Sequence, residues 1–473
     1  MNSTFKRSGG ALAARALALS VALSALPAMA QKSAAAKSAA ATQAEMARKL
    51  EQLATELAEV KTQLSQLQNQ QAQQVQQAQQ SPQNAQAVQQ AGASGSGWYG
   101  GAAGGTAAGA SPAPVMAAAA PVDQGPATVI SGYGELNYNR PTRQSDKAQL
   151  DLRRFVIGLQ HRINDRTKLV TELEVEHAVT SASDPGEVAV EQAYVEHQLT
   201  PILAARGGLF LMPVGLLNET HEPTAFYGVE RNFVETAIIP TTWREAGAQL
   251  IGNLDNGLTL QGGISTSFDL TKWDPASSEG RESPLASIHQ EAAQAKARNF
   301  GVFGAANYRG VPGLLVGASL FTGNATHGQA GYPSMRVTLG DVHARWTPGR
   351  WDLSALYARG YISNTEQLNA TMVGNPTLIP KTFDGWYVQG AYKLWQQGDY
   401  ALSPFVRLER FNTARAFANL GPGITPDAAR TEQVATVGAN FWLTRSVVIK
   451  ADYQRFKVNK DANRFNVGLG WAF

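Results

Sequence analysis

The sequence predicts an all-β transmembrane barrel of about sixteen antiparallel strands, preceded by a short helical coiled-coil extension. From residue 127 onwards, apolar and polar residues alternate in segments of about ten, as in strands whose two faces differ. A water-soluble barrel would bury the apolar faces, whereas a membrane barrel exposes them to lipid. A secretory signal, a strand number too high for an interior filled by side chains, and an aromatic C-terminal residue favour the membrane.

Residues 1–30 are expected to form a signal peptide. Lys6, Arg7 and Arg15 give a charged start, residues 16–26 form an apolar run, and residues 28–30 form a small-residue cleavage site. The apolar run is about eleven residues long, short of the ~20 that a membrane-spanning helix needs. No later run reaches that length, so a spanning helix is not expected.

Residues 31–90 are predicted to form a periplasmic coiled coil. Their apolar residues recur in steps of four and three, which is a heptad seam. Glu56 and Lys61 could pair between parallel helices, and the seam ends in a Gln-rich run that includes Gln71 and Gln74. The alternative is a lone solvated helix, which would leave the seam exposed. The seam residues are Met46, Leu50, Leu53, Leu57, Val60, Leu64 and Leu67.

Residues 91–126 are mainly Gly, Ala, Ser and Pro, and Trp98 and Tyr99 are their only aromatic residues. This composition predicts a flexible linker. The barrel is then expected over residues 127–473. Of the chain's 40 Lys and Arg, 8 precede residue 127, and of its 37 Asp and Glu, 5 do, which leaves 32 of each sign in the barrel. Ion selectivity must therefore depend on where the charges lie.

The composition agrees with a barrel whose outer face meets lipid. Charged residues make up 16% of the chain, below the ~25% of a soluble domain, and Gly reaches 45 residues. The chain has no Cys, so disulfides and thiolate metal sites are excluded.

The last segment has the clearest alternation. Phe465, Val467, Leu469, Trp471 and Phe473 share one face, and small or polar residues occupy the other. A terminal aromatic on such a strand resembles the signal by which outer-membrane barrels are passed to their assembly machinery, so Phe473 is the predicted assembly signal. Aromatic residues near other strand ends fit interfacial girdles or ordinary strand composition. They are Tyr138, Trp346, Trp395, Trp442 and Trp471.

Several stretches resemble the phosphate-selective porin O and P family. They are GLFLMPVG at 208–215, NETHEP at 218–223, FYGVER at 226–231, IIP at 238–240 and WREAG at 243–247. The resemblance implies a homotrimer of sixteen-stranded barrels, with loops that narrow each pore and basic residues that draw anions through. It also implies relatives with a helical extension that pass dicarboxylates, for which the predicted coiled coil would be three-stranded.

One segment departs from that pattern. Alternation places Glu172, Glu174 and Glu176 opposite Leu169 and Leu173, so three carboxylates would line the lumen and oppose an anion. The basic ladder of the family does not match this sequence residue by residue, which speaks against phosphate specificity but not against a pore.

The segment from Met212 to Gly247 is too long and Pro-rich for a tight turn and is predicted to fold into the channel. Mixed charges there would orient a dipolar or anionic solute, or would pair with one another and fix the loop to the wall. The charged residues are His221, Glu222, Glu230, Arg231, Glu235, Arg244 and Glu245.

Alternation places further charges on the non-lipid face, because a charge at the lipid midplane costs about 2–4 kcal/mol. Asp341, Glu409 and Asp452 share this face. Arg is suited to bidentate capture of carboxylate or phosphate, although each residue could instead be a wall pair or a rim charge. The pore-lining and anion-binding candidates are Arg154, Arg231, Arg244, Arg345, Lys393, Arg407, Lys450 and Arg464.

The predicted function is passive, anion-favouring diffusion of small solutes, phosphate or carboxylates, across the outer membrane of a Gram-negative bacterium. The expected partners are outer-membrane lipids, the barrel assembly machinery and two further copies of the chain. The alternative is a structural protein that tethers the envelope through its coiled coil. No nucleophile, phosphate-loop or metal motif occurs, so no enzyme, cofactor or nucleic-acid partner is expected.

Overall fold

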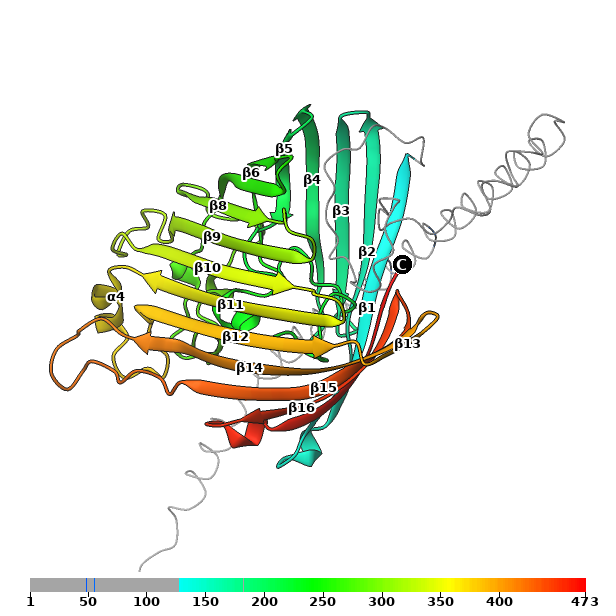
Figure 1. The fold of residues 1–473 in the computed structure, drawn as a ribbon. Coiled ribbons are helices and arrows are strands. Elements are labelled where there is room, and N and C mark those ends of the chain that lie inside the picture. Colours follow the sequence, from blue (N-terminus) through cyan, green and yellow to red (C-terminus); the bar gives the residue numbers. More distant parts are fainter. Residues whose placement is uncertain (1–47, 49–54, 56–126, 182) are drawn as a thin grey trace, which may run out of the picture. The chain divides into compact units, whose positions relative to one another are not determined.

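The barrel region forms one closed antiparallel sheet (Figure 1). The computed structural model describes Arg48, Thr55 and residues 127–181 and 183–473. The predicted signal peptide, linker and, apart from Arg48 and Thr55, coiled coil therefore lie outside the described residues. β1 pairs with both β2 and β17, which closes the ring.

Within the described residues the sheet has seventeen strands. β12 and β13 share one position in the ring, because both pair with β14, one after the other. The ring therefore has sixteen strand positions, which we call staves, as predicted. In chain order the strands are β1 (Thr128–Pro141), β2 (Gln149–Asn164), β3 (Thr167–Glu176), β4 (Val188–Thr200), β5 (Leu203–Leu211), β6 (Arg244–Asn253), β7 (Leu258–Thr266), β8 (Phe300–Tyr308), β9 (Leu314–Asn324), β10 (Arg336–Trp346), β11 (Trp351–Ile362), β12 (Thr382–Tyr392), β13 (Trp395–Gln397), β14 (Tyr400–Ala416), β15 (Glu432–Thr444), β16 (Val447–Phe456) and β17 (Arg464–Ala472).

The two ends of the barrel differ in their connections. Short turns such as 165–166, 201–202 and 445–446 lie at one end, which we call the turn end, together with the start of β1 and the end of β17. Long loops such as 212–243 and 267–299 lie at the other, the loop end. Bacterial outer-membrane barrels have this asymmetry, with short turns on the periplasmic side.

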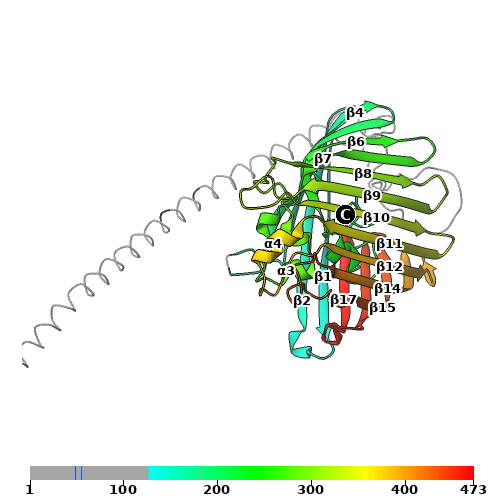
Figure 2. The same ribbon diagram turned by 90° about the vertical axis from the view of Figure 1, so that its left-hand side faces the viewer.

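The short helices lie in the loops that connect the strands at the loop end. They are η1 (Ser145–Lys147), η2 (Val234–Ile238), η3 (Leu270–Lys272), α3 (Glu279–Glu282), η4 (Ala286–Ile288), α4 (Thr365–Thr371) and η5 (Lys460–Ala462). α3 and α4 lie at the same end of the barrel (Figure 2), where their loops meet, since Trp273 Nε1 donates to Thr377 O at 3.2 Å. No helix among the described residues is long and apolar enough to cross a membrane.

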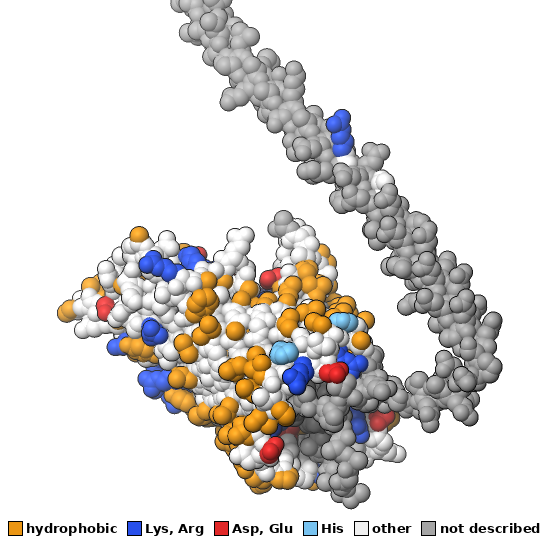
Figure 3. Space-filling view, turned by 90° about the horizontal axis from the view of Figure 1, so that it is seen from above, with side chains coloured by type: hydrophobic (Ala, Val, Ile, Leu, Met, Phe, Trp, Pro, Cys, Tyr) orange, Lys and Arg blue, Asp and Glu red, His pale blue; other side chains and the backbone are white. Residues whose placement is uncertain are grey.

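The strands place apolar side chains outside and polar side chains inside, as predicted. In β3, Leu173 is 46% exposed on the outer face, whereas its neighbour Glu174 is 5% exposed on the inner face. Exposed Val, Ile, Leu and aromatic residues recur on the outer face of the other strands, and hydrophobic side chains cover much of the face in Figure 3. Such an outer surface fits hydrocarbon and not water.

The last residue closes the seam between β17 and β1. Phe473 N donates to Gly132 O at 2.8 Å, and Gly132 N donates back to Phe473 O at 3.0 Å. A Cβ on Gly132 would lie 2.6 Å from the Phe473 ring, and one on Gly134 would lie 2.5 Å from Trp471. Glycine is required at both positions because the aromatic rings cover the backbone of β1. The role of Phe473 in assembly stays a prediction.

Candidate functional site: a loop folded into the barrel

The loop between β5 and β6, residues 212–243, lies inside the barrel. It begins where the sequence predicted but ends earlier, because Arg244 and Glu245 already belong to β6. Its backbone contacts strands on several sides of the ring. Gly215 N donates to Asp341 Oδ2 on β10 at 3.3 Å, and Val229 N donates to Asp452 Oδ2 on β16 at 2.7 Å. The loop therefore spans the interior.

Carboxylates of the wall hold this loop by its backbone. Besides Asp341 and Asp452, Glu409 on β14 accepts a hydrogen bond from Phe233 N at 2.5 Å. All three face the interior, as alternation predicted, and all three bind main-chain N–H groups. Charge-assisted bonds of this kind are stronger than neutral ones, so these carboxylates anchor the loop.

Glu235 fixes the fold of the loop itself. Its Oε1 accepts bonds from Leu216 N at 2.6 Å and Leu217 N at 2.7 Å, and its Oε2 accepts from Asn232 Nδ2 at 2.8 Å. Tyr387 on β12 donates to the same Oε2 at 3.0 Å. Burial raises the pKa of Glu235, although these hydrogen bonds oppose the rise. The Glu235 side chain thus links the start of the loop, its later part at Asn232 and the barrel wall at β12.

Arg154 and Arg407 are buried wall pairs that also bind the loop. Arg154 Nε lies 2.7 Å from Glu135 Oε1, and its Nη2 donates to His221 O at 2.5 Å. Arg407 Nε lies 2.7 Å from Glu409 Oε1, and its Nη1 donates to Tyr227 O at 3.1 Å. For these two candidates the structure supports the simpler alternative, in which the charge is paired.

Lys450 differs, because its ammonium group has no hydrogen-bond partner. Its Nζ lies 3.5 Å from the centroid of the Phe226 ring, and the side chain is almost fully buried. Lys450, Arg154 and Arg231 all interact electrostatically with Glu135. These residues form a basic cluster, Arg154, Arg231 and Lys450, on one side of the interior.

Arg231 lies in the loop and donates to the hydroxyl groups of Thr241 and Thr242. Burial, followed by the nearby Arg154, lowers the pKa of Arg231 to about 10. Arg464 on β17 lies beside the loop, since its Cζ is 5.9 Å from the Phe233 ring, and its Nε donates to Gln454 at 2.7 Å.

The three remaining candidates lie apart from this cluster. Arg244 begins β6 at the loop end and pairs with Glu291 at 3.0 Å. Arg345 lies toward the turn end of β10, where Asp352 binds it in bidentate fashion at 2.6 and 2.9 Å. Lys393 lies between β12 and β13 at the turn end. The structure therefore separates the predicted set into a loop-contacting group, one residue at the loop end and two at the turn end.

An acidic cluster lines the interior on β3 and β4: Glu172, Glu174 and Glu191. Tyr133 OH donates to Glu191 Oε2 at 2.9 Å and lies 2.6 Å from His221 Nε2. Strand alternation predicted that the first two carboxylates face the interior, but it did not predict this for Glu191. A register shift in β4 turns Glu191 and its neighbour Gln192 both inward, as their burial shows. Simple alternation does not reveal such a bulge.

Loop residues and strands together form a second, apolar lining near the loop end. Trp243 stacks on Phe268 with ring centroids 4.9 Å apart and meets the edge of Phe321 at 5.0 Å. The cluster continues over inward-facing residues of β5 and β8–β12. The interior is thus not polar throughout, which differs from the uniform polar lining that alternation predicted.

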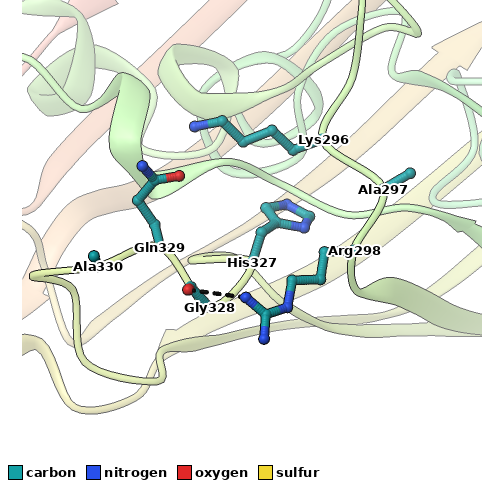
Figure 4. A pocket seen from close by; sticks show the side chains of 7 residues that line it. All are labelled: Lys296, Ala297, Arg298, His327, Gly328, Gln329 and Ala330. Carbon is teal, nitrogen blue, oxygen red and sulfur yellow. Dashed lines mark hydrogen bonds between the residues drawn. The ribbon is translucent and has the colours of Figure 1, made fainter.

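A shallow cavity of about 440 Å³ opens between loops 267–299 and 325–335 (Figure 4). Lys296 Nζ lies 3.0 Å from Asp269 Oδ2, and Arg298 Nη1 donates to Gly328 O at 3.1 Å. Burial acts to raise the pKa of Asp269, but hydrogen bonds from Thr271 and Lys296 outweigh burial, and the pKa is lowered. The cations here are already engaged. In the described ranges, no group of His, Asp and Glu residues is arranged to hold a metal ion.

Comparison with known proteins agrees with the fold. No family model matches the chain. An uncharacterised protein of Aquifex aeolicus is 29% identical over 355 residues, which cover 73% of this chain and 79% of that protein. The structure of OmpF of Salmonella typhi in complex with daunomycin matches with a TM-score of 0.50 and 14% identity, over 73% of this chain and 97% of OmpF.

Two further structures match less closely. An anion-selective porin from Comamonas acidovorans has a TM-score of 0.45 and 12% identity, over 73% of this chain and 99% of its own. The outer-membrane channel DcaP of Acinetobacter baumannii has a TM-score of 0.44 and 11% identity, over 73% and 97%. The likeness to OmpF is one of fold: a sixteen-stave porin barrel.

Proposed function

We propose that this chain is an outer-membrane porin that lets small solutes diffuse passively, with a preference for anions. The observation that carries the proposal is the inverted distribution of side chains, apolar outside and charged inside, together with a loop held within the barrel. The barrel would lie in the outer membrane of a Gram-negative bacterium, with the helical extension in the periplasm.

Polar atoms inside the barrel support a hydrated interior. Lys450 Nζ, Thr436 Oγ1, Gln454 Nε2 and both polar atoms of the Gln249 side chain are buried without a protein partner. Such groups are costly to bury unless water or a solute binds them. Water bound inside the barrel would satisfy them.

The two charged clusters support solute orientation. In the basic cluster Arg154 is already paired with Glu135, so Arg231 and Lys450 would attract carboxylate or phosphate oxygens, and the acidic cluster on β3 and β4 would repel them. An anion would therefore pass along the basic side, and a zwitterion would align between the two. Membership of the O and P family, and assembly as a homotrimer, remain part of this proposal.

Single-channel recording of the reconstituted full chain tests the pore. We expect discrete conductance steps in KCl and a chloride-to-potassium permeability ratio above one. The absence of conductance would exclude the pore, and a ratio below one would exclude only the anion preference. Competition of phosphate, succinate and an amino acid against the chloride current would then rank the solutes.

The predicted coiled coil supports a second role, in which the chain tethers the envelope. Deletion of residues 31–126 separates the two roles. We expect the shortened protein to conduct as the full chain does, whereas a tether would lose its attachment without that segment.

A further inference from the structure

Four arginines point away from the barrel near the loop end: Arg140 on β1, Arg359 on β11, Arg410 on β14 and Arg455 on β16. All four are exposed. The residues two positions before three of them, Tyr357, Leu408 and Tyr453, are exposed apolar side chains of the outer face. Since strand side chains alternate, each arginine shares that outer face.

The registers place these arginines at nearly one height in the membrane. Arg359 pairs with Asp384, which pairs with Asn412 on β14, and Arg410 lies two residues before Asn412 toward the turn end. Strands in a barrel are tilted, so each residue paired across to the next strand lies higher along the barrel axis, here closer to the loop end. Over two strands this rise is about 6 Å, and an offset of two residues back toward the turn end cancels it.

The same offset of two residues toward the turn end recurs around the barrel. Arg410 pairs with Gln433, which bonds to Lys457 N, and Arg455 lies two residues before Lys457. Across β17, Asn463 bonds to Thr142 N, and Arg140 lies two residues before Thr142. The four arginines therefore occupy every second stave from β11 to β1 as a level row, which we call the arginine belt.

Each arginine of the belt has an aromatic neighbour on the outer face. Arg140, Arg359 and Arg455 follow a tyrosine two residues earlier, and Arg410 lies opposite Trp386 on β12. Tyr and Trp mark the boundary between hydrocarbon and headgroups in membrane barrels. The belt thus lies at the level of the lipid headgroups at the loop end.

The belt has almost no acidic counterpart. Within residues 127–181 and 183–473, none of the four arginines forms an ion pair with a carboxylate within 4.0 Å. Asp384, which faces outward beside Arg359, lies 3.6 Å from Arg415. Among the charged residues of β3 and β5–β9, only Arg244 alternates with exposed outer-face residues such as Leu250, and it is buried and pairs with Glu291 at 3.0 Å. The exposed positive charge of the outer face is therefore confined to the other half of the barrel.

We propose that the arginine belt binds the phosphate groups of anionic lipids in the membrane leaflet at the loop end. Guanidinium groups stay charged, and they bind phosphate oxygens in bidentate fashion. Four of them at headgroup depth, with aromatic rings below, match a phosphorylated lipid whose chains cover the apolar strands. The half of the barrel formed by β3–β9 lacks this recognition.

The test uses the full chain in a neutral detergent. A diphosphorylated glycolipid, the same glycolipid without its phosphates, phosphatidylcholine and inorganic phosphate are added separately, and the melting temperature is measured by heat-dependent gel mobility. We expect only the diphosphorylated glycolipid to raise the melting temperature. Replacing all four arginines by Gln should remove more than half of that rise, and replacement by Lys should retain most of it.

The matched control replaces four exposed basic residues of loops and turns by Gln: Lys147, Arg430, Arg445 and Lys460. This variant loses the same charge but should keep the full rise. Native mass spectrometry of bound lipid gives a second readout that does not depend on stability. Equal loss in the control, equal stabilisation by phosphatidylcholine, or stabilisation by inorganic phosphate alone would each overturn the proposal. Conductance of the Gln variant should be unchanged, so this result is independent of the proposed pore function.

Discussion

Two sides of the interior hold the same loop in different ways. Near β5 and β8–β12, loop residues such as Trp243 and Ile238 pack into the apolar cluster. Near β14–β16 and β1–β2, the loop lies on charged side chains and bonds to them through its backbone. The apolar side holds the loop by side-chain packing, whereas the charged side holds it by hydrogen bonds and leaves the buried Lys450 Nζ without a hydrogen-bond partner. One loop is therefore held by apolar packing on one wall and by backbone hydrogen bonds to charged side chains on the other.

The largest effect is expected from truncation on the apolar side. Trp243→Ala removes a fully buried side chain that stacks on Phe268 and contacts Phe321. Such a change costs about 3–5 kcal/mol of stability. The loop should become sensitive to protease, and the conductance should become larger and noisier. An unchanged conductance and protease pattern would show that the apolar side does not anchor the loop.

A smaller effect is expected where the loop approaches β17 closely. A Cβ on Gly468 would lie 3.1 Å from Val229 Cγ1 and 3.0 Å from Asn137 Oδ1. Gly468→Val should displace the loop from the charged side, at a cost of about 1–3 kcal/mol. The melting temperature should fall less than in Trp243→Ala, and the anion preference should weaken. Gly207→Ala is the control, because nothing lies within 4 Å of its Cβ position.

The charged side should respond in selectivity more than in stability. Lys450→Met removes an ammonium group that has no hydrogen-bond partner. We expect the chloride-to-potassium permeability ratio to fall by about twofold, because one charge of the basic cluster is lost. Lys147→Gln, at an exposed loop position, should leave the ratio unchanged. A ratio that falls equally in both variants would place selectivity outside the basic cluster.

The smallest effect concerns pH at the loop end. The folded chain lowers the pKa of Asp269, so its ionised form stabilises the fold above the unfolded pKa of about 4. That contribution to stability is lost as the pH falls from about 4 through the lower pKa that Asp269 has in the folded chain. Asp269→Asn should therefore lower the melting temperature at pH 7 and flatten its fall below about pH 4. A melting curve with the same acid dependence as the parent would exclude this role.

The strand pattern was predictable because it depends on local rules. Alternation assigned Leu173 and Glu174 to opposite faces of one strand, and the structure places them so on β3. It also identified inward charges such as Arg407 and Lys450. The partners of these charges were not predictable, because Tyr227 and Phe226 come from a loop that is distant in the chain.

The sequence by itself determined the barrel class, the stave number and the direction of each face, because a period of two and the cost of charge in lipid act within single strands. Tertiary structure alone decided which arginines are paired, where Glu191 points, how loop and strands form an apolar lining, and that four outer arginines stand level. These features depend on register, strand tilt and loop path, which link residues hundreds of positions apart only after the ring has closed.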